Sequence, residues 1–525
     1  MVIDASEEVA RAATASGLRP IFVQQPGAAA EDLVDDMASL YTVDFTDEQF
    51  PSFVAEVLGP LRPSYVVSVT ERGAAAAAVA HRILQLPDAP TALLGGLREA
   101  AEAAWDGSPR DTVPHDAVPG RSARPGVLLI SHHPYTFFSR GGRNILPSAE
   151  VDVHLVTRNA AWGGVRGLTA NPLSHVAVCD IDDEDQWQAI CEWWVANRPV
   201  ARVVAVHERA VLPAAELRTK FGLPGMQYDT ALLFRDKVRM KQAVAEAGAA
   251  RVPAFTTLDD PADLDSVDWG TGRKVIKNRG ELAARDVHVV DSREAALRVC
   301  DTLDLSGSRY EIEEFVEGGI YHCDSVVRDG RIVFSSVGRY LANPAAYAPG
   351  GFFGTVLVTE GALPTRIRQL NERVLAALGM ESGTTHLELF HTPDDELVFC
   401  EIAGRPPGGI IPPVIEGHYG FNIVEADIRL QSGLDFTLPD TGTPRSGGAC
   451  GFIAFYPGGG DRRGIPEESS VGDFVLEHIH QRGAGDGEGG VRHSTDFLDS
   501  YVVGAPDAET LMQRIEAVKR EYWRR

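Results

Sequence analysis

The sequence lacks the marks of secreted, membrane-spanning and disulfide-stabilised proteins. Its six cysteines are scattered and form no Cys-x-x-Cys pair, which argues against a disulfide framework or a structural zinc site. Asp4, Glu7 and Glu8 stand where a signal peptide would need basic and then apolar residues. No apolar run approaches the roughly 20 residues that a membrane helix requires. We therefore expect a soluble protein of the cytoplasm with reduced thiols.

Positive charge is also scarce. Lys and Arg number 49 against 74 Asp and Glu, which gives a formal net charge of -25. Such a balance repels phosphate backbones and anionic membrane surfaces, so we expect neither nucleic acid nor membrane as a partner. A few well-placed lysines can still form a local nucleotide site. The chain has no Gly-x-Ser-x-Gly, no Walker-loop lysine and no His-Glu-x-x-His, so these catalytic motifs are missing as well.

With 525 residues, 44% of them hydrophobic, the chain is long enough for about two to four globular domains. Short β-type runs alternate with helical stretches in its first part, which predicts an α/β region with a parallel, Rossmann-like sheet. The expected strands are 21–23, 65–69, 126–130, 151–156, 175–178 and 202–206, with helices over 50–61 and 184–197.

Two stretches of this α/β region match each other in order. A single match of this kind can arise by chance, but several ordered matches at spacings of 137 to 139 residues favour a duplicated Rossmann-like domain. The matches are Glu71-Arg72 with Glu208-Arg209, Leu86-Pro87 with Leu223-Pro224, and residues 91–94 with 230–233.

Two polar stretches suggest where domains begin and end. Residues 106–125 are rich in Pro, Gly, Asp and Ser, as in a linker, and residues 438–446 form a second polar, Pro-containing stretch. We therefore predict four parts. These are a first Rossmann-like copy without catalytic residues over 1–120, a second copy over 121–233, the domain that carries the chemistry over 234–436, and a C-terminal α+β segment over 437–525.

Two lysines follow the second copy and could flank a polyphosphate. Lys237 lies near the start of an expected helix that Gly248 ends. Lys277 shares a strand face with Val275, and a lysine in that setting usually has an anionic partner or lies at a sheet edge. Lys237 alone would be interpreted as an ordinary solvated lysine on a helix. An acidic strand around Glu313 follows, which could offer a carboxylate to the exocyclic amine of a base.

A carboxylate pair gives the strongest chemical signal. Two strand-like runs flank a turn at Asp394-Asp395, and a hairpin centred there places Glu388 opposite Glu401, with Phe390 opposite Phe399. Like charges opposed across a ladder are destabilising unless a cation lies between them. Mg²⁺ is typically bound by one or two carboxylates together with substrate phosphates, so the pair predicts a magnesium site. The alternative is a surface hairpin in another register.

In this order, the segments resemble the ATP-grasp superfamily, and within it the carboxylate–amine ligases that include L-amino acid ligases and carnosine synthase. The resemblance covers about residues 125–436 and, more loosely, the rest of the chain. It implies an α/β and α+β multidomain protein in which a Rossmann-like pre-ATP-grasp domain precedes an ATP-grasp fold. The roles it implies are ATP phosphate contacts for Lys237 and Lys277, adenine contacts for Glu313 and the Val316 backbone, Mg²⁺ ligation by Glu388 and Glu401, and stabilisation of the acyl-phosphate chemistry by Arg405.

Two departures from the family pattern affect the expected site. The metal strand of the family often reads Glu-x-Asn-x-Arg, and here Ala403 stands in place of the asparagine between Glu401 and Arg405. The phosphate-covering loop, expected over 278–285, has fewer Gly and Ser residues than usual, and Arg279 or Arg285 could compensate.

The resemblance implies an ATP-dependent ligase with ATP and Mg²⁺ or Mn²⁺ as cofactors. It would join a small carboxylate, such as an amino acid, to an amine through an acyl phosphate. Two alternatives stay open: an ATP-grasp carboxylase of the biotin carboxylase or purine-pathway type, and a nucleotide-binding scaffold without turnover. The expected partners are ATP, the acid and the amine, and a homodimer is also open.

Overall fold

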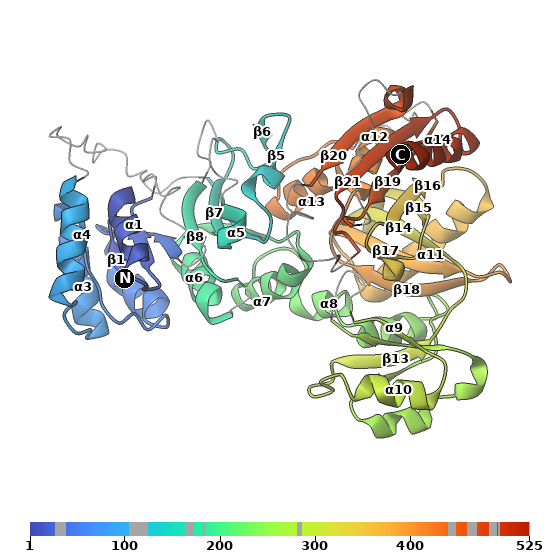
Figure 1. Cartoon of the computed structure of the whole chain (residues 1–525), viewed down its shortest axis with the longest axis horizontal. Coiled ribbons are helices and arrows are strands. Elements are labelled where there is room, and N and C mark those ends of the chain that lie inside the picture. The colour runs from blue at the N-terminus through green and yellow to red at the C-terminus, as the bar shows by residue number, and fades with distance from the viewer. Residues whose placement is uncertain are drawn as a thin grey trace. The chain divides into compact units, whose positions relative to one another are not determined.

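The computed structural model describes residues 1–26, 38–103, 124–162, 173–181, 184–280, 286–438, 448–458, 470–481, 491 and 494–523. They divide into two compact units, Met1–Gly225 with Gln431–Leu434, and Met226–Leu430 with Asp435–Arg525 (Figure 1). Most of the two expected boundary stretches, 106–125 and 438–446, lies outside the described residues.

A seven-stranded sheet forms the centre of the first unit. Its strand order is β1-β2-β3-β8-β7-β4-β9, and all neighbours are parallel except β3 and β8, which pair antiparallel. The strands are β1 (Val2–Ile3), β2 (Ile21–Gln24), β3 (Ser39–Thr42), β4 (Gly126–Ser131), β7 (Asp152–Thr157), β8 (Leu173–Val178) and β9 (Val200–Val204). The strand expected over 65–69 is reduced to a single parallel bridge between Val67 and Val2.

Helices join these strands. The expected helix over 184–197 is confirmed as α6, and the one expected over 50–61 is present as a short α-helix that continues as a π-helix. The helices of this unit are α1 (Glu7–Ala15), α2 (Phe50–Phe53), η1 (Val54–Leu58), α3 (Glu71–Leu84), α4 (Thr91–Ala103), η3 (Tyr135–Phe138), α5 (Asn159–Trp162), α6 (Glu184–Asn197), η5 (Glu208–Ala210) and α7 (Val211–Phe221).

The two segments expected as separate copies share one sheet and one core. Leu40 pairs with Val178 and Tyr41 with Ala177 where β3 meets β8. The ring of Phe53 packs edge-on against Trp193 at 5.0 Å, and the core cluster contains buried residues from both segments. Residues 1–103 therefore share one compact unit with the second segment, because their third strand pairs with β8.

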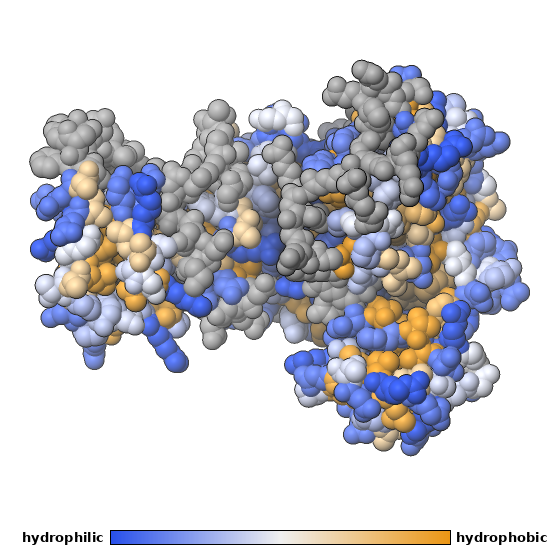
Figure 2. Space-filling view, viewed as in Figure 1, coloured by the Kyte–Doolittle hydropathy of each residue, from blue (hydrophilic) through white to orange (hydrophobic). Residues whose placement is uncertain are grey.

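The second unit contains two antiparallel sheets. The small sheet has the order β10-β13-β11-β12 and is covered by α10 (Arg293–Cys300). Its strands are β10 (Phe255–Leu258), β11 (Lys274–Asn278), β12 (His288–Val290) and β13 (Tyr310–Glu314). Figure 2 shows apolar residues gathered over the part of the unit where this sheet and α10 lie.

The large sheet has eight strands in the order β18-β17-β14-β15-β16-β19-β21-β20. Helix α9 (Lys237–Glu246) and helix α11 (Ala362–Leu378) contribute to the core beside β14, β15, β17 and β18. The strands are β14 (Gly319–Arg328), β15 (Arg331–Tyr340), β16 (Phe352–Leu357), β17 (Gly383–His391), β18 (Leu397–Ala403), β19 (Ala449–Phe455), β20 (Val475–His480) and β21 (Asp499–Ala505). The other α-helices among the described residues of this unit are α8 (Tyr228–Leu233), α12 (Ile411–Tyr419), α13 (Ile423–Ser432) and α14 (Ala508–Tyr522).

The C-terminal segment belongs to this large sheet. β19 pairs with β16, so the segment extends the sheet edge beyond the expected domain boundary at 436. Helix α14 packs on the added strands, with the ring of Tyr522 stacked on Phe455 at 3.7 Å. Among the described residues, no helix combines the length and apolar character needed to cross a membrane.

Candidate active site

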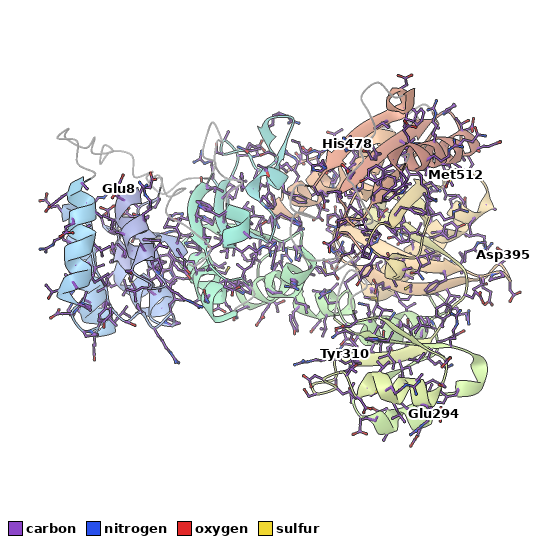
Figure 3. All side chains as sticks on the ribbon, viewed as in Figure 1. Glu8, Glu294, Tyr310, Asp395, His478 and Met512 are labelled. Atoms are coloured by element: carbon purple, nitrogen blue, oxygen red, sulfur yellow. The ribbon has the colours of Figure 1, made fainter. Side chains whose placement is uncertain are left out.

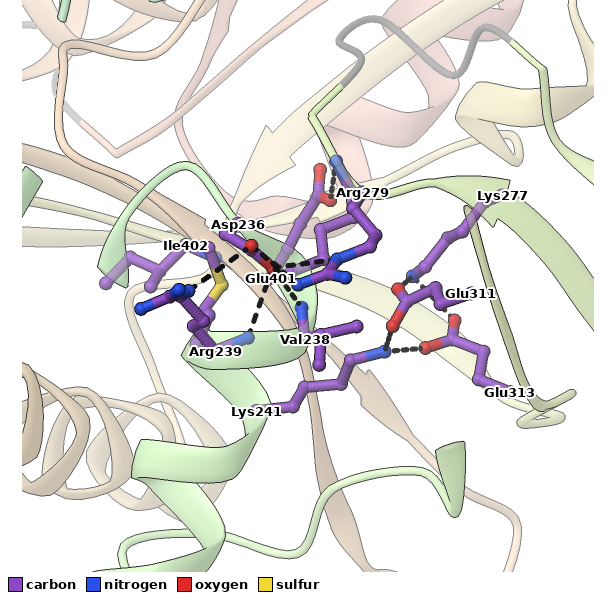
Figure 4. Close-up of polar contacts among 12 residues, drawn as sticks. Asp236, Val238, Arg239, Lys241, Lys277, Arg279, Glu311, Glu313, Glu401 and Ile402 are labelled. Atoms are coloured by element: carbon purple, nitrogen blue, oxygen red, sulfur yellow. Dashed lines mark hydrogen bonds and ion pairs between the residues drawn. The ribbon is translucent and has the colours of Figure 1, made fainter. Parts of the chain in front are cut away.

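The first site element is the N-terminus of α9, which carries Lys237. The Asp236 side chain caps this helix by accepting from the backbone N–H groups of Val238 and Arg239 at 3.0 and 3.2 Å. Arg279, just after β11, forks onto the same carboxylate with contacts of 2.7 to 3.1 Å. Arg279 thereby ties the start of α9 to the small sheet (Figure 4). The rest of the expected phosphate loop, residues 281–285 including Arg285, lies outside the described residues.

Lys237 meets one of the two carboxylates that the sequence assigns to metal binding. Its Nζ atom lies 3.2 Å from Oε2 of Glu401. The Lys237 side chain is 11% exposed and that of Glu401 is 36% exposed, so this ion pair lies at the edge of the buried region. A residue predicted for phosphate contact and a residue predicted for metal contact are thus adjacent.

Behind this pair lies a buried group of two lysines and two glutamates, which we name the buried quartet: Lys241, Lys277, Glu311 and Glu313 (Figure 4). Lys241 Nζ lies 2.7 Å from Glu311 Oε2 and 2.5 Å from Glu313 Oε2, and Lys277 Nζ lies 2.6 Å from Glu313 Oε1. The strand register causes this, because Lys277 stands opposite Glu311 where β11 pairs with β13. The two lysines and the two glutamates balance each other in charge.

Burial and pairing act in opposite directions on the protonation of the buried quartet. Burial lowers the pKa of Lys277, but the Glu313 carboxylate and other nearby acidic groups outweigh it, and the net pKa lies well above the usual range. Burial likewise raises the pKa of Glu313, yet the charges of Lys277 and Lys241 bring that pKa down to about 2. Both groups therefore stay ionised at neutral pH.

The structure brings Glu313 to the predicted site but gives its carboxylate two lysine partners. Lys241, which the sequence reasoning did not assign, is one of them. The available signal was its position four residues after Lys237, which places both lysines on one face of α9. Glu311 is fully buried, and neither of its oxygens has a well-aligned hydrogen bond within the protein. Val316 is buried two residues after β13.

The predicted carboxylate pair is present on the hairpin of β17 and β18. Glu388 stands directly opposite Glu401 in the strand register, as predicted. The further prediction that Phe390 faces Phe399 is wrong, because a bulge after Glu388 shifts the register and pairs Leu389 with Phe399. Figure 3 shows Asp395, which has φ +63°, at the tip of this hairpin.

A hydrogen-bonded chain of side chains holds Glu388 from behind. The Tyr340 hydroxyl donates to Glu388 Oε1 at 2.7 Å, and His386 Nε2 lies 3.4 Å from the same oxygen. His386 Nδ1 lies 2.6 Å from Asp324 Oδ1, and His322 Nδ1 lies 2.8 Å from Asp324 Oδ2. Sequence reasoning missed this chain, although His322-x-Asp324 and His386-x-Glu388 each place two polar groups on one face of a strand.

A glycine makes room for His322, which lies at the far end of this series of hydrogen-bonded side chains. Gly338 stands opposite His322 across β14 and β15, and a Cβ atom there would lie 2.1 Å from His322 Nε2. Any larger residue would therefore displace the imidazole. His322 Nε2 instead reaches the hydroxyl of Thr355 at 2.8 Å, which completes the chain.

The hydrogen bonds among Glu388, His386, Asp324 and His322 favour the ionised form of both carboxylates. Burial raises the pKa of Asp324, but the charge and hydrogen bond of His322 and those of His386 bring it down to about 2. Burial lowers the pKa of His386, but its bonds to Asp324 and Glu388 raise it to about 9. Burial also raises the pKa of Glu388, and His386 with Tyr340 more than offsets this, so the net shift is downward. Glu388 is thus a carboxylate with one oxygen fixed.

These contacts also separate two candidate metal sites. His322, Asp324 and His386 come close enough to be considered as ligands. Their N···O distances of 2.6 and 2.8 Å are those of hydrogen bonds with a proton between the atoms, so this group has no room for an ion. Glu388 and Glu401 fit Mg²⁺ better, because they offer oxygen ligands from opposed, partly exposed carboxylates.

Arg405 follows β18 in a loop of small residues. A Cβ atom on the preceding Gly404 would lie 3.0 Å from Met226 Cε and 3.2 Å from Phe234 Cβ, so the glycine lets the loop pack against the segment before α9. Arg405 Nη1 donates to the carbonyl oxygen of Pro406 at 2.7 Å. Ala403, which replaces the family asparagine, is the last residue of β18.

Comparison with known proteins supports the assignment of the fold. The chain is 28% identical to the L-arginine-specific L-amino acid ligase of Bacillus subtilis over 323 residues, which is 58% of this chain and 74% of the relative. No family model matches the sequence. The structure resembles an L-amino acid ligase from Bacillus licheniformis with a TM-score of 0.57 and 17% identity, over 77% of this chain and 98% of the other.

Other ATP-grasp enzymes resemble the chain to a similar degree. A carboxyaminoimidazole ribonucleotide synthase from Aspergillus clavatus, solved with ATP, has a TM-score of 0.56 at 13% identity and covers 76% of this chain and 98% of its own. The biotin carboxylase domain of a Hydrogenobacter thermophilus 2-oxoglutarate carboxylase, solved with MgADP and bicarbonate, has 0.54 at 14% identity and covers 75% and 90%. The chain has the ATP-grasp fold and an L-amino acid ligase as a relative, so the predicted resemblance is confirmed.

Proposed function

We propose that the chain is an ATP-dependent carboxylate–amine ligase whose acid substrate is an amino acid or a similar small acid. The observation that carries the proposal is the group of charges on the hairpin and α9. Glu388 faces Glu401, and Lys237 lies 3.2 Å from Glu401. The relative that is an L-amino acid ligase supports the same class of reaction.

The reaction that these residues suit has two steps. A substrate carboxylate oxygen attacks the γ-phosphorus of ATP, the bond to ADP breaks, and an acyl phosphate forms. The amine nitrogen then attacks the acyl carbon, the bond to phosphate breaks, and the amine loses a proton to solvent. Phosphoryl transfer depends on alignment and charge neutralisation more than on covalent catalysis, which fits a site of lysines and carboxylates.

Each residue has a role in this scheme. Glu388 and Glu401 would hold Mg²⁺, which when bound neutralises phosphate charge. Lys237, beside Glu401, would contact the phosphates, and Arg405 would stabilise the acyl-phosphate step. Lys277 would contact the phosphates from the buried quartet. Glu313, with the Val316 backbone, would form the adenine end, where a carboxylate can accept from an exocyclic amine.

The fold alone does not separate ligases from carboxylases, because both kinds of enzyme resemble the chain to a similar degree. The sequence relative favours the amine ligase. A matrix of phosphate-release assays tests this choice, with pairs of L-amino acids, including L-arginine, and with bicarbonate. We expect ATP-dependent release only with a productive acid and amine. Phosphate release that requires bicarbonate and no amine would indicate a carboxylase and not a ligase. If no combination of substrates releases phosphate, a nucleotide-binding scaffold without turnover would be favoured.

We also propose that residues 1–103 and 124–233 are duplicated pre-ATP-grasp copies, followed by an ATP-grasp region over 234–436 and a C-terminal extension of its sheet. The strand orders support this. Val67, β1, β2 and β3 are neighbours in the same order as β9, β4, β7 and β8. Glu71 and Glu208 are 137 residues apart. With the same spacing, Leu40 corresponds to Ala177, and Tyr41 corresponds to Val178. The pair Leu40–Val178 therefore corresponds to the pair Ala177–Tyr41, which is the other residue pair between β3 and β8. The copies therefore meet as two halves related by a pseudo-twofold axis.

In this arrangement the first copy covers the edge of β8 and the apolar surface of the second copy, as the subunit of a dimer would. Deleting residues 1–123 should expose the edge of β8 and the apolar side chains that pack against Tyr41 and Phe53. We expect the truncated protein to aggregate or dimerise in size-exclusion chromatography, while any soluble fraction keeps ATP affinity within about threefold of the full chain. A truncated protein that stays monomeric and loses ATP binding would contradict this role.

A further inference from the structure

Three histidines gather at one end of the first unit's sheet. His132 and His133 directly follow β4, and His207 follows β9, its neighbour in the sheet. The imidazoles of His132 and His207 are stacked with centroids 4.4 Å apart, and His133 meets His207 edge-on at 5.4 Å. We name these three residues the histidine cluster. It lies outside the residues to which the proposed reaction assigns a role.

The histidine cluster lies at the carboxyl ends of neighbouring parallel strands, where open α/β sheets bind their ligands. From β4 the chain proceeds through β7 and β8 on one side, and β9 returns to the other side of β4. The strand order therefore reverses between β4 and β9. In open parallel sheets, ligands bind at the carboxyl ends of the strands beside this reversal. All three histidines follow those carboxyl ends.

In the first copy, the position that corresponds to the histidine cluster contains an ion pair between Asp4 and Arg72. By the strand register, Asp4 after β1 corresponds to His132 after β4, and the spacing of 137 residues relates Thr70 to His207. Asp4 Oδ2 accepts from the Thr70 hydroxyl at 2.7 Å and from Arg72 Nε at 3.0 Å. An aspartate thus fills the reversal point of the first copy. At this point in the second copy, an imidazole stands in place of that carboxylate.

The surroundings in the second copy favour an anion. His207 Nδ1 accepts from the backbone N–H of Arg209 at 3.3 Å, so its Nε2 carries the proton in the neutral ring and can donate. Arg158, exposed at the end of β7, donates through Nε to the His132 carbonyl oxygen at 3.2 Å. Arg209 is also exposed. The stacked rings of His132 and His207, tilted by 21°, do not converge on one point as metal ligands would.

We propose that the histidine cluster binds a small carboxylate anion, of the kind carried by a free amino acid. The carboxylate would lie against His207, whose counterpart Thr70 contacts the Asp4 carboxylate in the first copy. The proposal rests on the duplication and does not require the ligase reaction. The same chemistry could come from an amino acid substrate or from an amino acid that acts as an effector, and the experiment separates the two.

The test is a titration of the full chain, with histidine labelled at Cε1 and observed by NMR in carboxylate-free buffer. The probes are acetate, L-alanine and ethylamine, which share size but differ in the carboxylate. We expect acetate and L-alanine to shift the signals of the histidine cluster and ethylamine to leave them unchanged. His207→Asn should weaken L-alanine binding by roughly tenfold, because the shorter amide can still accept from the Arg209 N–H but removes the Nε2–H donor. Thr70→Val, at the counterpart position of the first copy, is the matched control and should bind as the wild type does.

Steady-state kinetics then identify the source of the carboxylate. A rise in KM for an amino acid in His207→Asn, with kcat and the KM for ATP unchanged, assigns the site to a substrate. An unchanged KM with weakened binding assigns it to an effector. His133→Asn, at a half-buried position, serves as a second variant if His207→Asn does not fold. The proposal is wrong if acetate and L-alanine shift none of these signals, or if both folded variants bind as the wild type does.

Discussion

Replacing either hairpin carboxylate, by Glu388→Gln or Glu401→Gln, should lower turnover by roughly 10²–10³-fold or more while the protein stays folded. A neutral amide keeps the shape of the side chain but cannot supply the charge that holds Mg²⁺ opposite its partner. Glu396→Gln is the matched control, since Glu396 lies at the exposed turn of the same hairpin and pairs only at the surface with Arg251. Phosphate release at rising Mg²⁺ concentration measures the effect, and full activity in either variant at ordinary Mg²⁺ would remove the metal assignment.

The same two variants revise an expectation about stability. The sequence alone predicts unchanged or higher stability, because removing one of two facing charges relieves repulsion. In the structure each carboxylate has its own positive neighbour, His386 for Glu388 and Lys237 for Glu401. We therefore expect the free energy of unfolding to fall slightly, by about 1 kcal/mol, since each substitution also removes a favourable pair.

Lys241→Met should destabilise the second unit by about 3–5 kcal/mol, because it leaves Glu311 and Glu313 buried with one lysine for two carboxylates. Methionine has a similar length and fills the same volume, so the loss of charge is the main change. Lys220→Met is the control: Lys220 pairs with Glu192 at 2.6 Å, but both side chains are partly exposed. An exposed pair of this kind contributes about 0–1 kcal/mol.

Hydrogen exchange locates the effect of Lys241→Met. Peptides that contain β11 and β13 should lose most of their protection, because these strands carry the carboxylates left unpaired. Peptides from the sheet of the first unit should exchange as in the wild type. Unchanged protection across β11 and β13 would mean that Lys241 does not hold the buried quartet together.

The local motifs of the sequence predicted much of the fold and part of the candidate site. The alternation of strands and helices, the helix that begins near Lys237 and the Glu388–Glu401 pairing all depend on neighbours within a few residues or across one tight turn. Such features are encoded in spacing. The bulge after Glu388 was not predicted, because counting residues outward from the turn does not reveal an extra residue in one strand.

The unpredicted parts depend on contacts between distant strands. Asp324 meets His386 because β14 pairs with β17, and the sequence gives no sign of that pairing. Lys241 was missed because a lysine in a helix usually faces solvent, and the two glutamates that pair with it lie on β13, far along the chain from α9. The sharing of one core by both α/β segments likewise depends on the pairing of β3 with β8.

The proposed mechanism makes one direct demand on the chemistry. If the carboxylate attacks the γ-phosphorus, one of its oxygens must leave with phosphate when the amine displaces it. An acid substrate labelled with ¹⁸O in the carboxylate, supplied with ATP, Mg²⁺ and the amine, should therefore give inorganic phosphate that contains one ¹⁸O per turnover. Mass spectrometry of the phosphate reads this out. Release of unlabelled phosphate during amide formation would contradict the acyl phosphate and with it the central account of this site.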